Sequence, residues 1–168
     1  RMRPRSLDEV AGQRHILGEG KLLRRAIESD RFTSLIFYGP PGTGKTSMAS
    51  VIARTTGSRF ESLNGVESNV AEIRARIDQA RTWRELRGET TILFIDEIHR
   101  FNTTQQDALL HAVESGLVTL VGATTENPAF SVNPALRSRS SVFGLKPVDE
   151  SAVTELLRRA LIHEGVEA

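Results

Sequence analysis

The chain contains no cysteine, which excludes disulfide bonds and thiolate metal sites. No apolar run approaches the roughly 20 residues that a membrane-spanning helix needs, and we expect no signal peptide and no membrane partner. An excess of one charge is also missing, because 22 Lys and Arg stand against 21 Asp and Glu, a net charge of +1. Strong non-specific binding to nucleic acid usually comes with a larger positive excess. From these absences we expect a cytoplasmic or nucleoid-associated protein.

The length of 168 residues is enough for one domain with a proper core. The chain begins at Arg1 without an initiator Met and stops at Ala168, just after a helix-like segment. We therefore expect it to be a piece of a longer protein.

One octapeptide organises the chain: Gly39-Pro40-Pro41-Gly42-Thr43-Gly44-Lys45-Thr46. It matches the phosphate-loop pattern G-x-x-x-x-G-K-[ST], and it has the required context because it follows an apolar run and precedes a helical pattern. Glycines let backbone N–H groups surround a phosphate in conformations that a Cβ forbids. Lys45 then supplies charge to the outer phosphates and Thr46 offers a hydroxyl to Mg²⁺. The plainer alternative is a Gly-Pro turn before an ordinary helix.

Apolar runs and helical periodicities alternate along the rest of the chain. The runs predict strands at 34–38, 59–63, 91–95, 118–123 and 142–145. The periodicities predict helices between 20 and 29, from 47 to a stop at Gly57, from 70 to about 88, from a capping box at 103–106 to Gly116, over 136–139 and from 149 to about 163. This alternation predicts an α/β fold with a parallel sheet covered on both faces, and a phosphate site at the carboxyl ends of its strands.

Two carboxylates follow the buried run 91–95 directly. Asp96 is placed to hold Mg²⁺, opposite Thr46. Glu97, one residue further out, can orient the attacking water and take its proton. A surface acidic turn after a core strand is the alternative.

Hydrolysis also needs a group that senses the γ-phosphate and a group that neutralises developing charge. The strand after Asp96 ends in Thr124 and Thr125, and a hydroxyl there can hold the γ-phosphate or the water, or only cap the loop. Arg137 and Arg139 precede the last strand. Either can reach a neighbouring subunit's phosphates as a finger in trans, or remain a solvated arginine.

The predicted helix over 70–88 carries several basic residues, namely Arg74, Arg76, Arg81, Arg84 and Arg87. Such a row is more often a solvated face than a DNA-binding surface. Trp83 on the same helix is expected to pack rather than to stack on a base.

The order of these motifs resembles that found in the AAA+ ATPases of the clamp-loader/RuvB branch. More closely, the sequence resembles the RarA/MgsA family, the bacterial relatives of the Werner-helicase-interacting protein. The matching segments are 1–4, 10–13, 24–27, 39–46, 94–102, 105–108 and 122–128. The resemblance covers essentially the whole chain.

The resemblance implies an AAA+ P-loop core with a five-stranded parallel sheet, and the roles argued above for the loop and the two acids. It assigns the sensor to Thr125 in preference to Thr124. Ser138-Arg139 matches a Ser-Arg-Cys element, with Ser140 in place of its Cys, so Arg139 is favoured as the finger. Asn64 matches a position that can hold the glutamate inactive, although Asn-Gly is also simply a turn. Val10 and Ala11 match the segment that packs on adenine.

The resemblance also implies a division into an ATPase core over 1–148, with a lead-in over 1–33, and the first helix of a truncated lid over 149–168. The cofactors would be ATP and Mg²⁺, and the fragment alone would be weakly active. Implied partners are single-stranded, gapped or forked DNA, single-strand-binding protein and further copies of the chain. The implied function is ATP hydrolysis at stalled replication forks. The alternatives are a clamp-loader subunit, a RuvB-like Holliday-junction motor, or a nucleotide-dependent binding module without turnover.

Overall fold

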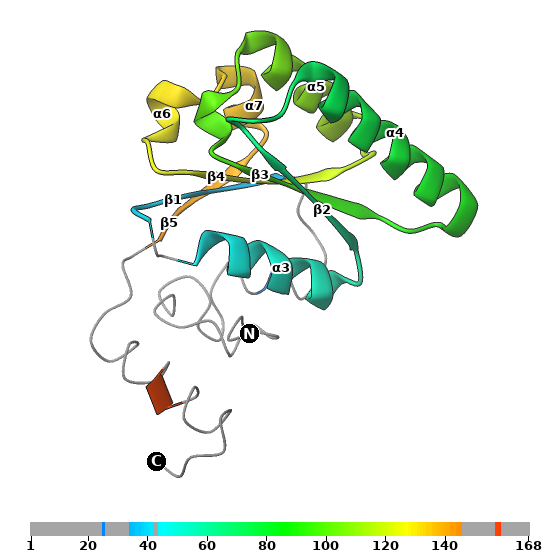
Figure 1. Ribbon diagram of the computed structural model, residues 1–168, viewed down its shortest axis with the longest axis horizontal. Coiled ribbons are helices and arrows are strands. Elements are labelled where there is room, and N and C mark those ends of the chain that lie inside the picture. The colour runs from blue at the N-terminus through cyan, green and yellow to red at the C-terminus, as the bar shows by residue number, and fades with distance from the viewer. Residues whose placement is uncertain (1–24, 26–33, 42–43, 146–156, 159–168) are drawn as a thin grey trace.

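The computed structural model of the chain describes residues 25, 34–41, 44–145 and 157–158 (Figure 1). Apart from Arg25, which is helical, the helix expected between 20 and 29 lies outside these ranges. So do Val10 and Ala11, the loop residues Gly42 and Thr43, and the expected division at residue 148.

The five strands form one parallel sheet in the order β2-β3-β4-β1-β5. Their bounds are β1 Ser34–Tyr38, β2 Arg59–Asn64, β3 Thr91–Asp96, β4 Thr119–Thr124 and β5 Ser141–Gly144. Each agrees with the predicted strand to within one residue at either end. The five-stranded parallel sheet is therefore confirmed.

Helices cover both faces of this sheet (Figure 1). Their bounds are α3 Lys45–Thr56, α4 Val70–Arg87, η2 Ile98–Arg100, α5 Thr103–Glu114, α6 Pro128–Ser131 and α7 Pro134–Ser138. Gly57 ends α3 in the left-handed conformation, with φ 67°, as the sequence predicts. The short helices η2 and α6 were not predicted. The start of α6 did carry a signal, because Asn127 caps it and Pro128 occupies its first position.

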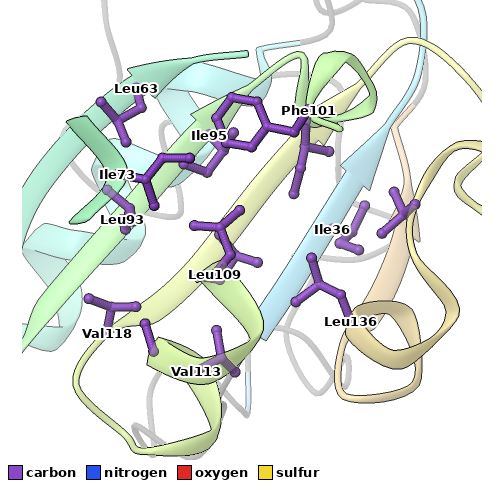
Figure 2. Close-up of a cluster of buried hydrophobic side chains, with 14 of the residues drawn as sticks. Ile36, Leu63, Ile73, Leu93, Ile95, Phe101, Leu109, Val113, Val118 and Leu136 are labelled. Atoms are coloured by element: carbon purple, nitrogen blue, oxygen red, sulfur yellow. The ribbon is translucent and has the colours of Figure 1, made fainter. Parts of the chain in front are cut away.

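Two apolar clusters lie on opposite faces of the sheet. Along β1, Leu35 and Phe37 pack against α3, while Ile36 faces the cluster formed with α4, α5 and α7. Figure 2 shows this second cluster, in which Leu109 of α5 and Leu136 of α7 lie over the strands. Since the inner strands are buried on both faces, their sequences are continuously apolar.

The capping box of α5 lies one residue earlier than predicted. Asn102 accepts a hydrogen bond from the Gln105 N–H at 2.9 Å, and the Gln105 side chain accepts one from the Asn102 N–H at 2.8 Å. Gln106, predicted as part of the box, is buried instead. Its amide donates to the carbonyl of Phe101 and accepts from the N–H of Asn133. The prediction that Thr103 caps the helix was therefore wrong. Gln106 would have to bond back to Thr103, but its amide group is used by the buried backbone groups of Phe101 and Asn133.

Candidate active site

The carboxyl ends of β1, β3 and β4 meet around a cavity of about 360 Å³. Its lining consists of Pro41, Gly44, Lys45, Thr46, Ser47, Asp96, Glu97, Thr124 and Thr125. The structure thus brings the described part of the phosphate loop together with both carboxylates and both threonines. Arg139 does not line this cavity.

The glycines that bound the phosphate loop meet two different backbone requirements. The N–H of Gly39 donates to the carbonyl of Thr124 at 3.2 Å, and a Cβ at Gly39 would lie 2.7 Å from the carbonyl oxygen of Leu145. Gly44 has φ 86° and forms the N-cap of α3. A left-handed backbone and a close backbone approach both favour glycine.

The Lys45 ammonium contacts the first residues of the phosphate loop. It donates to the carbonyl oxygens of Gly39 at 2.8 Å and Pro40 at 3.0 Å. Burial lowers the pKa of Lys45 below its ordinary value, and the negative charge of Asp96 opposes this shift. Lys45 also begins α3, a 12-residue helix whose positive dipole end therefore faces the cavity.

Thr46 and Asp96 are the groups of this cavity that suit Mg²⁺. Asp96 is the last residue of β3 and Thr46 lies in the first turn of α3. Mg²⁺ usually takes one or two protein oxygens and completes its shell with phosphates and water. Across the described residues, no cluster of three or more His, Asp or Glu side chains forms a metal site from protein alone. One hydroxyl and one carboxylate suit a metal ion whose other ligands are phosphates and water.

Glu97 has an unusual backbone conformation. With φ 54° and ψ 48° it is left-handed, and it is the one non-glycine residue of the described chain with a positive φ. Its carbonyl accepts the N–H of Arg100 at 2.9 Å, which closes the turn into η2. Strained backbone of this kind persists where the surroundings fix it, and it is frequent at functional sites.

The two threonines at the end of β4 have different surroundings. Thr124 is buried, and its hydroxyl lies 2.8 Å from Nδ1 of His99 and accepts the N–H of Glu126 at 3.0 Å. Thr125 is exposed at the cavity, and no hydrogen bond to another described residue engages its hydroxyl. Of the two hydroxyls, that of Thr125 is the one left to meet a ligand.

Arg137 and Arg139 also differ. The Arg137 guanidinium donates to the carbonyls of Pro128, Ala129 and Val132, at 2.9 to 3.3 Å, and so holds α6 in place. Arg139 has a half-exposed side chain, whose Nε lies 3.0 Å from a Glu114 carboxylate oxygen.

Arg139 and the phosphate loop of the same chain lie at opposite ends of the strands. Ser141 begins β5 and pairs with Leu35 near the start of β1, so Arg139 lies near the amino ends of the strands. The loop follows the carboxyl end of β1. This placement separates Arg139 from its own cavity and leaves it on the surface.

Asn64 makes a local turn. Its side-chain oxygen accepts the N–H of Val66 at 2.8 Å, and within the described residues no hydrogen bond joins its side chain to Glu97. In this structure Asn64 therefore acts as the turn residue that the Asn-Gly pair indicates.

The basic residues of α4 are largely engaged within the chain. Arg76 pairs with Glu61 at 2.7 Å, and the guanidinium of Arg59 lies over the ring of Trp83 at 3.8 Å from its centroid. Arg87 approaches the same ring at 5.0 Å. These contacts favour packing over DNA binding for this face of α4.

Sequence reasoning missed two residues beside the site, Gly65 and His99. The sequence marks Gly65 only as half of an Asn-Gly turn, and His99 only as part of the matching segment 94–102. Their positions depend on long-range contacts, to Asp96 for Gly65 and to Thr124 for His99.

Residues 35–147 match the family described as the ATPase family associated with various cellular activities (AAA). The chain belongs to this family. Among curated relatives, the AAA domain-containing protein Rv2559c of Mycobacterium tuberculosis is 52% identical over 96% of this chain and 35% of its own length. Replication-associated recombination protein A of Escherichia coli K12 is 49% identical over 96% of this chain and 36% of its length. ATPase WRNIP1 of Dictyostelium discoideum is 43% identical over 95% of this chain and 18% of its length.

These relatives confirm the resemblance to the RarA/MgsA family, and the chain spans about a third of the bacterial relatives' length. Among solved structures, the Holliday junction branch migration motor RuvB of Thermotoga maritima matches with a TM-score of 0.78 and 31% identity. The match covers 99% of this chain and 56% of RuvB, which confirms the AAA+ P-loop core. Within the described residues no helix has the length and apolar character to cross a membrane.

Proposed function

We propose that the protein hydrolyses ATP with Mg²⁺ and couples hydrolysis to DNA transactions at replication forks, as an oligomer of the AAA family. The observation that carries the proposal is the single cavity lined by Lys45, Thr46, Asp96 and Glu97. A phosphate clamp, an acid suited to a metal and a second acid for water are the minimal parts of a hydrolytic phosphoryl-transfer site. The DNA role is supported by the names of the relatives, which include a replication-associated recombination protein.

In this proposal each residue of the cavity has its own role. Lys45 moves from the loop carbonyls to the outer phosphates, and Thr46 and Asp96 hold Mg²⁺. The metal supplies charge neutralisation on the phosphates. Glu97 takes a proton from a water whose oxygen attacks the γ-phosphorus, while the bond from that phosphorus to the bridging oxygen breaks. The products are ADP and inorganic phosphate.

Two further residues complete the proposal. Thr125 contacts the γ-phosphate or the attacking water, a role supported by its exposed hydroxyl at the cavity. Arg139 reaches the phosphates of a neighbouring copy, a role supported by its place on the surface, away from its own cavity. Turnover would then require assembly, because each site lacks its own finger.

The remaining parts stay proposals from the resemblance. They are the adenine contact by Val10 and Ala11, the lid over 149–168, and the binding of single-strand-binding protein and of single-stranded, gapped or forked DNA.

Glu97→Gln in the full-length protein tests the proposal. The amide keeps the shape of the side chain but accepts no proton, so turnover should vanish while ATP binding persists. Unchanged turnover would remove Glu97 from the mechanism. Absence of turnover in the wild type at any DNA concentration would favour a nucleotide-dependent binding module.

The DNA part is tested separately, by measuring turnover with and without gapped or forked DNA. Faster hydrolysis with DNA is expected, and equal rates would overturn the coupling. The likeness to RuvB favours one second candidate, a branch-migration motor. Migration of a four-way junction by the full-length protein would support it, whereas capture of a sliding clamp would favour a clamp-loader subunit.

A further inference from the structure

His99 is a buried histidine that joins the two catalytic segments of the site. It belongs to η2, which begins directly after Glu97, and its side chain is only 6% exposed. Its Nδ1 lies 2.8 Å from the hydroxyl oxygen of Thr124, at the end of the neighbouring strand β4. The pair therefore links the segment of the proposed base to the segment of the proposed sensor.

On the β4 side, one hydroxyl holds the backbone on both sides of Thr125. The Thr124 oxygen faces His99 and also accepts the N–H of Glu126 at 3.0 Å, which spans Thr125. A hydroxyl offers one donor and two acceptor sites, so either tautomer of His99 is satisfied. When Nδ1 carries the proton, the hydroxyl is free to donate to the Glu126 carbonyl at 3.3 Å. The backbone that carries Thr125 therefore depends on the contact between the Thr124 hydroxyl and His99.

On the other side, η2 follows Glu97 directly and packs on β4 through Ile98. The Arg100 N–H closes the turn on the Glu97 carbonyl, and Ile98 is fully buried against Gly122 of β4. A Cβ at Gly122 would lie 3.1 Å from the Ile98 side chain, so the approach is close. Because this packing is close, a shift of the His99 ring should also shift the backbone of Glu97.

We propose that His99 is a positioning residue, which sets the separation between Glu97 and Thr125 through the Thr124 hydroxyl. The inference rests on the proposed hydrolysis. It differs from a packing role in one respect. A histidine that only fills space would affect stability, whereas a positioning contact affects turnover at nearly constant ATP affinity. The phosphate loop touches Thr124 through the Gly39 N–H and the Thr124 backbone carbonyl, and this bond does not involve the hydroxyl that meets His99.

The test uses the full-length protein and compares Thr124→Val with Thr124→Ser. Valine keeps the shape and loses the hydroxyl, whereas serine keeps the hydroxyl and loses a methyl group. We expect Thr124→Val to lower kcat by about tenfold to a hundredfold, as small misplacements of reacting groups do, with the ATP dissociation constant changed by less than about threefold. Thr124→Ser should retain most of the turnover. Equal kcat for the two variants would overturn the proposal.

His99→Phe gives the second arm, because His99 does not line the cavity. Its kcat should fall like that of Thr124→Val, and the double variant should lose little more than either single one, since both remove the contact between Nδ1 and the Thr124 hydroxyl. His99→Phe also removes the approach of Nε2 to the exposed Glu126 carboxylate at 3.9 Å, a contact expected to contribute little. Additive losses would overturn the inference. His111→Phe, on the exposed face of α5, is the matched control and should keep wild-type turnover.

Glu97→Gln distinguishes a failure of the positioning role from a failure of the proposed base. If Glu97→Gln abolishes turnover and Thr124→Val does not lower it, only the positioning role fails. If Glu97→Gln leaves turnover intact, Glu97 is not the base and the positioning role fails with it, whereas the proposed function itself fails only if the wild type shows no turnover.

Discussion

Gly65 lies against the backbone of Glu97. Its N–H donates to the carbonyl of Asp96 at 2.8 Å, and a Cβ built at Gly65 would collide with the carbonyl oxygen of Glu97. This close approach arises from the sheet. The strands β2 and β3 stay paired up to Asn64 and Asp96, and the backbone turns directly after each of these residues. The left-handed conformation of Glu97 is therefore formed against a neighbour that has no side chain.

We expect Gly65→Ala to impair turnover more than ATP binding. The added methyl group meets a backbone carbonyl rather than a flexible side chain, so Glu97 must move. Overpacking of this kind costs about 1–3 kcal/mol of folding stability. Steady-state hydrolysis, ATP titration by calorimetry and urea unfolding of the full-length variant measure the three effects.

Gly88→Ala is the matched control for this prediction. Gly88 has φ 65° with nothing near its would-be Cβ, so alanine there costs roughly 1 kcal/mol through backbone strain alone. Stability should fall while kcat remains that of the wild type. If both variants lowered kcat equally, the contact of Gly65 with Glu97 would have no special role in turnover.

Lys45→Ala should weaken ATP binding without changing the folding stability of the nucleotide-free protein. Lys45 is partly desolvated, and burial lowers its pKa, so the charge contributes little to the stability of the nucleotide-free protein. With ATP the same charge meets phosphates, and its loss also leaves the carbonyls of Gly39 and Pro40 facing them. ATP affinity should drop at least about a hundredfold, with the unfolding midpoint unchanged. Retained affinity would contradict the phosphate-loop assignment.

The sequence predicted the parts of the molecule that local pattern encodes. Each inner strand appears as a continuous apolar run, so the sheet was predicted to within one residue at each strand end. The phosphate loop was predicted from the fixed spacing of its glycines and lysine, and its role stays a prediction. Gln106 was misread because its partners, Phe101 and Asn133, are set by the packing of α5 on α7. His99 was missed for the same reason, since its partner lies 25 residues away.

Arg137 shows the same limit within the candidate site. From the sequence, Arg137 and Arg139 were two arginines of one polar turn, separated only by the family resemblance. Three carbonyl acceptors around α6 now mark Arg137 as a structural residue. The sequence does not reveal this, because the three acceptors lie five to nine residues before Arg137 and meet its guanidinium only when α6 and α7 are folded beside each other.

Arg137→Ala should therefore destabilise the domain. The loss of hydrogen bonds from a charged donor to the carbonyls of Pro128, Ala129 and Val132 should cost about 1.5–3 kcal/mol. Arg139→Ala removes only a half-exposed ion pair with Glu114 and should cost less than about 1 kcal/mol. Urea unfolding of the two variants measures the difference, and the reverse order would contradict the assignment.

Arg139→Ala should instead lower turnover in the assembled protein, and the loss should be repairable by mixing. If Arg139 serves a neighbouring site, a subunit with Arg139→Ala still has a complete cavity, and a Glu97→Gln subunit still has its finger. Mixed assemblies then contain some active interfaces, so hydrolysis should rise above that of either variant alone. Glu114→Gln is the control, because it removes the ion-pair partner and leaves the guanidinium, and its turnover should match the wild type. Absence of recovery at every mixing ratio, with assembly intact, would show that Arg139 does not act in trans.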